Sequence, residues 1–156
     1  MSGNSEIDKL DLQILAHLLK DAKTPYTEIA NRLTVSGGTI HVRMKKLESM
    51  GIVKGSHIEV DPSLLGYDIC AFVGIYLEKG SLYNQIVDQL QNIPEIVEAH
   101  YTTGQYSIFL KVICKNTRQL RAVLNDKVQA IEGIQRTETF ISLETGLKRP
   151  LHIHTS

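Results

Sequence analysis

The chain has 156 residues, with 17 basic and 17 acidic side chains and therefore no formal net charge. This length allows one ordinary domain or two small ones. No apolar run approaches the roughly 20 residues that a membrane-spanning helix requires, and the N-terminus lacks the basic stretch and apolar core of a signal peptide. We therefore expect a cytoplasmic protein with no membrane partner.

The two cysteines, Cys70 and Cys114, lie inside apolar, strand-like runs without CxxC or Cys/His spacing. This placement predicts reduced, buried thiols rather than a disulfide or a metal site. His152 and His154 could pair on a metal, but without further ligands nearby a disordered terminus is expected there. The sequence thus predicts no metal site and no cofactor.

Two short amphipathic helices are predicted near the N-terminus. Asp8 can cap the first helix, whose apolar stripe includes Leu10 and Ile14. Thr24 can cap the second helix, with Pro25 in the first helical position, where a missing N–H costs nothing. A tight turn leads on to a third helix, and this arrangement is typical of a helix-turn-helix unit.

The third helix is predicted to begin after Ser36, whose hydroxyl can accept a hydrogen bond from a backbone N–H of the first turn. It ends at Gly51, a glycine suited to the C-terminal cap. Its buried face holds four apolar residues at helical spacing: Ile40, Met44, Leu47 and Met50. The opposite side is small near the start and basic further on, so it can enter a DNA major groove. An isolated basic helix is more often only a solvated face, and the helix-turn-helix context is what favours DNA binding.

The segment after this helix, Ile52–Val60, predicts a strand, a turn and a second strand, which together would form a wing. Between Thr39 and Ser56 four basic residues stand against the single acidic residue Glu48. This local excess predicts modest DNA binding that depends on salt.

Beyond Asp61–Pro62 the pattern changes to that of a second domain. Four strands and two helices are expected in the order β-α-β-β-α-β, which is the ferredoxin-like arrangement. They are Ile69–Leu77, Ser81–Asn92, Ile96–Thr102, Tyr106–Cys114, Thr117–Ile131 and Ile134–Leu143. The predicted fold class is α+β. Its parts are a winged helix-turn-helix domain at 1–61, a linker at 62–68, a ferredoxin-like domain at 69–145 and a tail at 146–156.

The first strand of the second domain, Ile69–Leu77, is apolar on both of its faces. Two helices can cover only one face of a four-stranded sheet, and an antiparallel sheet open to water should alternate between apolar and polar residues. A second apolar face therefore predicts a homodimer that forms through this domain.

Five motifs along the chain carry a family resemblance. They are LDLQIL (Leu10–Leu15), the helix start Ser36–Arg43, GIV (Gly51–Val53), LGYD (Leu65–Asp68) and TTGQYS (Thr102–Ser107). With them the chain resembles the Lrp/AsnC family of bacterial and archaeal transcription regulators over essentially its whole length. The stretches GTIHVR and YTTGQYSIFLKV are most similar to the asparagine-responsive members.

The resemblance implies a regulator rather than an enzyme: a winged helix-turn-helix that binds double-stranded operator DNA, joined to a ligand-sensing domain that assembles dimers. Such dimers often associate further into octamers, as tetramers of dimers. The resemblance places the DNA-binding residues on the recognition helix, with Ser36 at its cap and Lys45 toward phosphate. These residues are Ser36, Gly38, Thr39, Val42, Arg43, Lys45 and Lys46. Gly37 stands where relatives usually have a proline.

In this family the effector site lies between dimers, around the glycine-containing loop that joins the second and third strands. The corresponding residues are Tyr101, Thr102, Thr103, Gly104, Gln105, Tyr106 and Ser107, with Gln129 as a further candidate. Backbone N–H groups and threonine hydroxyls there can hold the carboxylate of a small amino acid. Many relatives carry an acidic residue in place of Ser107, and this difference points to L-asparagine as the effector. Without the resemblance, the same loop would be interpreted as a polar hairpin turn.

Two other functions are compatible with this frame. One is an architectural DNA-binding protein that needs no effector. The other is an enzyme, because haem-pathway decarboxylases resemble the family and have abandoned DNA binding. The basic recognition helix argues against the enzyme, which would have no use for it.

Overall fold

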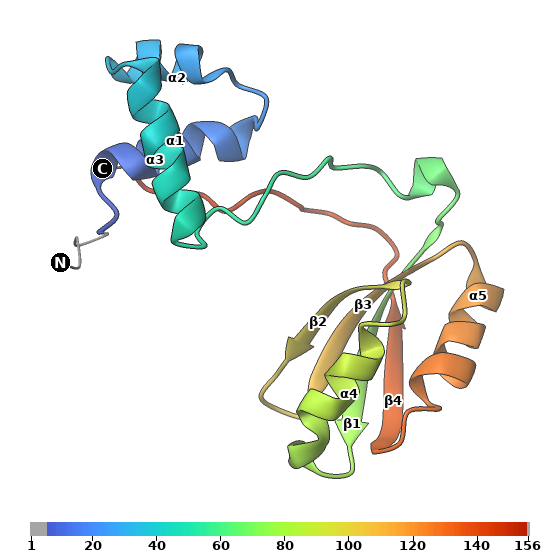
Figure 1. Ribbon diagram of the computed structural model, residues 1–156. Helices are drawn as coiled ribbons and strands as arrows, with labels where there is room; N and C mark the ends of the chain where they lie inside the picture. The colour runs from blue at the N-terminus through green and yellow to red at the C-terminus, as the bar shows by residue number, and fades with distance from the viewer. Residues whose placement is uncertain (1–5, 156) are drawn as a thin grey trace. The chain divides into compact units, whose positions relative to one another are not determined.

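The computed structural model describes residues 6–155, which fall into two compact units. One unit runs through Ile58 and also takes in the C-terminal segment from Leu147, while the other is Glu59–Gly146 (Figure 1). No helix within the described residues is long and apolar enough to cross a membrane.

The first unit contains three helices, α1 (Lys9–Lys20), α2 (Tyr26–Leu33) and α3 (Gly37–Ser49). Asp8 and Ser36 cap α1 and α3 as predicted, and Ser36 Oγ accepts from the Thr39 N–H at 3.1 Å. The core of the unit is built from residues on all three helices: Ile14, Ile29, Ala30, Ile40, Met44 and Leu47. The helix-turn-helix prediction is therefore confirmed.

The predicted start of α2 is wrong by one residue. Pro25 takes the cap position, and the Thr24 hydroxyl instead donates to the Asp21 carbonyl at 2.8 Å. A residue that precedes proline is held in an extended conformation, so Thr24 belongs to the connection and not to the helix.

The paired strands predicted for Ile52–Val60 are also wrong, since this stretch contains no strand. A strand requires a hydrogen-bonded neighbour. The first residues of the predicted wing bond to α3 instead, because the N–H groups of Ile52 and Val53 both donate to the Leu47 carbonyl, at 3.0 and 3.2 Å. The wing is therefore an extended loop.

The C-terminal segment does not match the disordered terminus expected around His152 and His154. It lies along the first unit, where Pro150, Leu151 and Ile153 line an apolar groove of about 680 Å³, although Leu151 is 77% exposed and Ile153 is half-buried. Side chains of α1, including Leu15 and Leu18, also line this groove.

The second unit is a four-stranded antiparallel sheet in the order β2-β3-β1-β4, which confirms the ferredoxin-like prediction. The strands are β1 (Ile69–Leu77), β2 (Ile96–Tyr101), β3 (Ile108–Cys114) and β4 (Ile134–Ile141). The helices are α4 (Tyr83–Leu90) and α5 (Thr117–Ala122), and α5 continues as a π-helical stretch over Val123–Val128. Short 3₁₀ turns at Ser63–Leu65 and Gly80–Leu82 precede β1 and α4.

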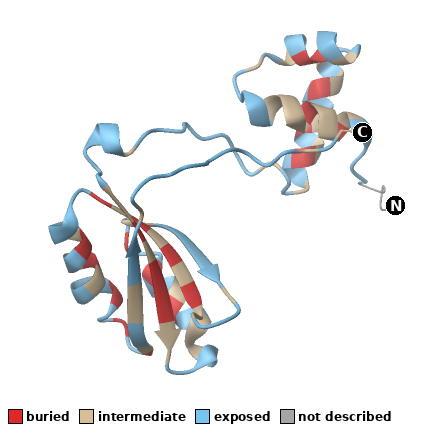
Figure 2. Ribbon diagram, turned by 180° about the vertical axis from the view of Figure 1, so that it is seen from behind, coloured by how far each residue is buried: buried red, intermediate tan, exposed pale blue. Residues whose placement is uncertain are grey.

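Both helices of this unit lie over the same face of the sheet (Figure 1). Ala71, Val73 and Ile75 of β1 are fully buried beneath them, and the central strands carry most of the buried positions (Figure 2). The opposite face, here called the open face, has no helix over it. Its aromatic side chains are Phe72 and Tyr76 of β1, Phe109 of β3 and Phe140 of β4.

The cysteine prediction is confirmed in part. Both thiols are free, but Cys114 is buried whereas Cys70 is only half-buried. Burial raises the pKa of the Cys114 thiol above its ordinary value.

Thr34, in the turn between α2 and α3, has a left-handed backbone with φ of +56°. For a β-branched residue this conformation costs about 1–2 kcal/mol, and glycine removes that cost while losing some entropy on folding. Thr34→Gly should therefore raise the free energy of unfolding by about 0.5–1 kcal/mol in urea denaturation. Thr34→Val is the matched control and should bring no gain. A Gly variant no more stable than the Val variant would contradict the strained turn.

Candidate DNA interface and effector site

The solvent-facing side of α3 is the candidate DNA interface. Val42 is 68% exposed, and Gly38 and Lys45 are exposed on the same side. The Thr39 hydroxyl lies 2.9 Å from Ser36 Oγ, which holds both side chains at the start of the helix. A helix with small residues at its N-terminal end and a cation about two turns further on suits a major groove.

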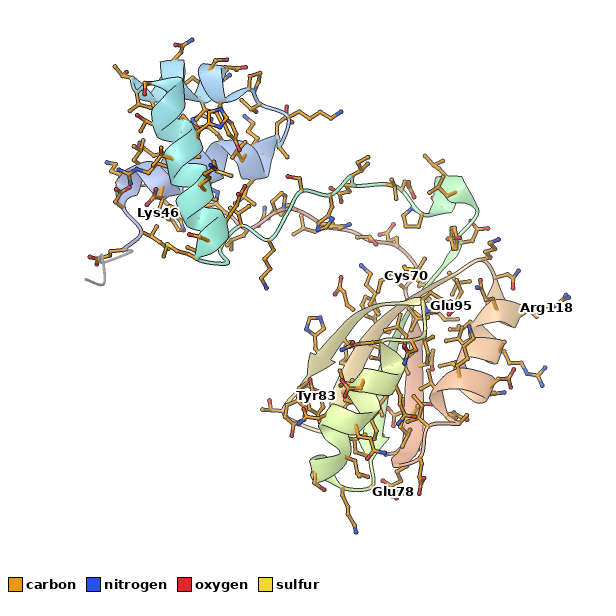
Figure 3. All side chains as sticks on the ribbon, viewed as in Figure 1. Lys46, Cys70, Glu78, Tyr83, Glu95 and Arg118 are labelled. Atoms are coloured by element: carbon orange, nitrogen blue, oxygen red, sulfur yellow. The ribbon has the colours of Figure 1, made fainter. Side chains whose placement is uncertain are left out.

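A second side of α3 faces α1, and the contact is built on one buried carboxylate. Asp11 of α1 is fully buried, the one charged side chain buried in the described part of the chain. Lys46 Nζ donates to Asp11 Oδ2 at 2.6 Å, and Arg43 Nη1 donates to Asp11 Oδ1 at 3.2 Å. Arg43 also pairs with Asp8, and Lys46 donates to the Glu6 carbonyl at 2.8 Å. Lys46 lies on the α1 side of α3 (Figure 3).

These contacts set the protonation of both carboxyl groups. Burial alone would raise the pKa of Asp11, but the hydrogen bond from Lys46 and those from the Asp8 backbone and Arg43 outweigh it, so the pKa lies below its ordinary value. The hydrogen bond from Arg43 is the main reason that the pKa of Asp8 is also lowered. Both groups are ionised at neutral pH, and the cluster is two carboxylates with two cations.

This cluster changes what the recognition helix offers to DNA. Of the four basic residues counted in the sequence around α3, Arg43 and Lys46 are neutralised in place by Asp11 of α1 and by Asp8 at the cap of α1. Of the predicted DNA-binding residues, the structure gathers Ser36, Gly38, Thr39, Val42 and Lys45 at the exposed side and turns Arg43 and Lys46 toward α1.

The buried role of Asp11 is not among the predictions made from the sequence. A signal was present, because Asp11 stands three residues before Ile14 and therefore lies on the apolar stripe of α1. A carboxylate at such a position needs a cationic partner from another helix. The sequence instead predicts that Arg43, Lys45 and Lys46 all bind DNA, with Lys45 toward phosphate.

The candidate effector loop connects β2 to β3 over residues 102–107. The Thr102 N–H donates to the Ser107 carbonyl at 3.1 Å, and the Thr102 hydroxyl donates to the Tyr106 carbonyl at 2.8 Å. The Ser107 N–H donates to the Ile75 carbonyl of β1 at 2.9 Å. Thr103, Gly104 and Gln105 form the exposed tip, and Gly104 has φ of +100°. A ligand would therefore meet the polar groups of the tip, while Thr102 and Ser107 hold the base of the loop.

Two predicted effector residues contact other elements. The ring of Tyr101, at the end of β2, packs on Tyr83 of α4 with centroids 4.2 Å apart, at the edge of the unit (Figure 3). Gln129 Nε2 donates to Thr137 Oγ1 of β4 at 3.0 Å. Since β3 and β1 separate β4 from β2, Gln129 and the loop lie at opposite edges of one sheet.

Residues 6–155 hold no cluster of three or more His, Cys, Asp or Glu side chains suited to a metal ion. His41, which lies beside the exposed face of α3, packs edge-on against the Tyr26 ring of α2, with centroids 4.8 Å apart.

The two units define a class of protein: a helix-turn-helix DNA-binding unit on one chain with a ligand-binding ferredoxin-like domain. Comparison supports this class, since residues 7–54 match the winged helix-turn-helix DNA-binding family and residues 70–151 match the Lrp/AsnC ligand binding domain. The chain belongs to the Lrp/AsnC family of transcriptional regulators.

Individual relatives cover nearly the whole chain. The regulatory protein AsnC of Haemophilus influenzae is 48% identical over 145 residues, which are 93% of this chain and 97% of the relative. The solved structure of Escherichia coli AsnC has a TM-score of 0.87 and 44% identity and covers 94% of this chain and 98% of its own. A feast or famine regulatory protein from Mycobacterium tuberculosis, solved in complex with L-methionine, has a TM-score of 0.88 and 26% identity over 96% of this chain and 100% of its own.

The buried cluster predicts how stability depends on pH. The folded-state pKa of Asp11 lies below its unfolded value near 3.8, so its contribution is complete above that value and is lost as the pH falls toward the folded pKa. Urea denaturation followed by circular dichroism should show stability falling as the pH drops below about 3.8.

Asp11→Asn should lower the free energy of unfolding at pH 7 by about 3 kcal/mol, the lower end for a broken buried pair, because Arg43 and Lys46 keep a quarter of their surface exposed. The matched control is Glu28→Gln, which breaks the exposed Arg32–Glu28 pair and should cost under about 0.5 kcal/mol. Equal losses in the two variants would contradict the role of Asp11.

Proposed function

We propose that the protein binds double-stranded operator DNA through α3 and changes its assembly, and so its DNA binding, when a small amino acid occupies the loop between β2 and β3. The observation that carries this proposal is the combination of a capped, exposed α3 on one unit with an exposed glycine loop on the other. Assembly sets the spacing of the recognition helices, and the spacing selects the operators that can be bridged.

For DNA, the groove-facing group is Gly38, Thr39 and Val42, with Lys45 reaching phosphate. Arg43 and Lys46 support the interface indirectly, because they fix α3 on α1 through Asp11. With two of the local cations neutralised, few phosphates are contacted by each α3. Affinity for operators then depends on several recognition helices binding together.

For the effector, we propose an α-amino acid, and specifically L-asparagine. The tip of the loop offers backbone N–H groups and the Thr103 hydroxyl to a carboxylate, and Gly104 lets the backbone approach the ligand closely. A family member of the same fold is solved with L-methionine, which supports an amino acid as the chemical class. Asparagine itself follows from the likeness of the loop to the asparagine-responsive members, in which Ser107 replaces the acidic residue of many relatives.

For assembly, we propose a homodimer through the open face, with dimers associating further into an octamer. The rings on this face are partly exposed, Phe140 by 48%, and Phe72 and Phe109 stack across β1 and β3 with centroids 5.9 Å apart. A second copy would remove this apolar surface from water. In a larger assembly, Gln129 of one protomer would be available to the loop of another.

Neighbouring lysines on α3 allow a direct test of the DNA interface. Lys45→Ala should weaken binding to duplex DNA at all sequences and lower the slope of log K against log salt by about 0.9, because one phosphate contact is lost. Lys46→Ala should lower stability but leave the slope unchanged, because Asp11 already neutralises that charge. Fluorescence anisotropy from 50 to 200 mM salt measures the slope for both variants. A reduced slope in the Lys46 variant alone would contradict the assignment of Lys45, and not Lys46, to phosphate.

Substitution of Gly104 tests the effector loop. Gly104→Glu should abolish amino-acid binding while DNA binding persists, because it adds bulk and negative charge at the tip and strains a backbone with positive φ. Gly80→Glu is the matched control, since this exposed glycine lies outside the loop with open space around it.

Calorimetric titration of the wild type and of both variants with asparagine, glutamine, aspartate, leucine and lysine measures amino-acid binding. Selective asparagine binding supports the proposal. Binding of another amino acid would support a ligand-responsive regulator but contradict asparagine as its effector. Binding of none of them would favour an architectural DNA-binding protein. Loss of DNA binding in the Gly104 variant would make the loop structural.

A further inference from the structure

Gly74, in the middle of β1, marks a close approach between the effector loop and the open face. A Cβ atom placed on Gly74 would lie 2.4 Å from Cδ1 and 2.5 Å from Cε1 of Tyr106, closer than any real contact. The ring of Tyr106 therefore lies directly on the backbone of β1, in space that only a glycine leaves open.

The ring of Tyr106 continues across β1 and reaches β4. Its hydroxyl donates to Glu138 Oε2 at 2.7 Å. The other carboxylate oxygen, Oε1, accepts from the Tyr76 hydroxyl at 3.2 Å and from Arg136 Nη1 at 2.9 Å. The Arg136 guanidinium in turn lies over the Tyr76 ring, 3.7 Å from its centroid. One carboxylate on β4 thus collects donors from the loop, from β1 and from its own strand.

The backbone of Tyr106 is part of the effector loop and is held there by hydrogen bonds. The Tyr106 carbonyl accepts the Thr102 hydroxyl, and the next residue, Ser107, donates to β1. On the open face the Tyr106 ring contacts Tyr76, Phe109 and Phe140, with centroids 5.2, 5.8 and 6.4 Å apart. A shift of the loop backbone at residue 106 therefore moves the ring at the centre of the aromatic surface.

We propose that Glu138 is a positioning residue that, through its hydrogen bond with Tyr106, couples the effector loop to the open face of the sheet. With the bond made, the ring covers Gly74 and the face has one defined shape. When a ligand moves the loop, the ring leaves Gly74 and the shape of the face changes. This inference rests on the proposed function, in which the open face is the contact between copies.

The test separates coupling from ligand binding. Glu138→Ala should leave asparagine affinity within about 3-fold of the wild-type value. It should remove the asparagine-induced change in the association constant between copies, which for allosteric coupling is typically about 5- to 150-fold. Glu138→Gln keeps an acceptor for the Tyr106 hydroxyl and should restore most of the response. The matched control is Tyr76→Phe, which removes the other tyrosine bond to the same carboxylate and should respond as the wild type does. Calorimetry and sedimentation of the full chain measure both quantities.

A full response in Glu138→Ala, or an equal loss in Tyr76→Phe, would overturn the proposal. A readout independent of the effector comes from the six tyrosines of the chain, followed by NMR with ¹³C-labelled tyrosine. The bond to Glu138 is the main reason that the pKa of Tyr106 is raised to about 12, with burial adding to it, and Glu138→Ala should lower this pKa toward its ordinary value near 10. If all six tyrosines titrate together in the wild type, the contact does not exist in solution and the proposal fails. If the contact is present but the wild type binds no amino acid, the proposed function and the coupling fail while the geometry stands.

Discussion

The sheet of the second unit has two faces, and its two helices lie over only one of them. Everything proposed for regulation depends on this constraint. The covered face buries Ala71, Val73 and Ile75 and gives the unit a core of its own. The open face keeps its aromatic rings at the surface, and an apolar surface of this kind is typical of a site that another surface covers. Because the candidate effector loop leaves the same sheet at the end of β2, the proposed ligand site and the proposed contact between copies would meet in one small region around Gly74.

The DNA-binding unit depends on a different contact, between α1 and α3. Asp11 is fully buried and accepts hydrogen bonds from two cations of α3. The orientation of α3 on α1 therefore depends on these charged contacts as well as on apolar packing. A buried ion pair is weak evidence for stability in itself, but removing one partner leaves an uncompensated charge. The arrangement therefore penalises any orientation of α3 that breaks it, and it leaves Lys45 as the exposed cation on the groove side.

Much of this structure could be predicted from the sequence, because its signals are local. The bounds of β1, the caps Asp8 and Ser36 and the β-α-β-β-α-β order follow from periodicity and from capping residues. One error is local: the N–H groups of Ile52 and Val53 bond to the end of α3 and are not available to a paired strand. Another error involves distant segments, since the C-terminal segment lies along helices more than 100 residues earlier in the sequence. For the site, the exposed residues of α3 could be predicted, but the pairing of Asp11 with Arg43 and Lys46 depends on how α1 crosses α3. The Tyr106–Glu138 contact likewise depends on the strand order.

The central claim is that an amino acid bound at the loop changes how copies of the chain assemble. Sedimentation velocity of the intact protein at micromolar concentration, without and with saturating asparagine, tests it most directly. The account predicts dimers or larger species in the absence of the ligand and a shift of that distribution when asparagine is added. A stable monomer whose sedimentation is the same in both conditions would contradict it.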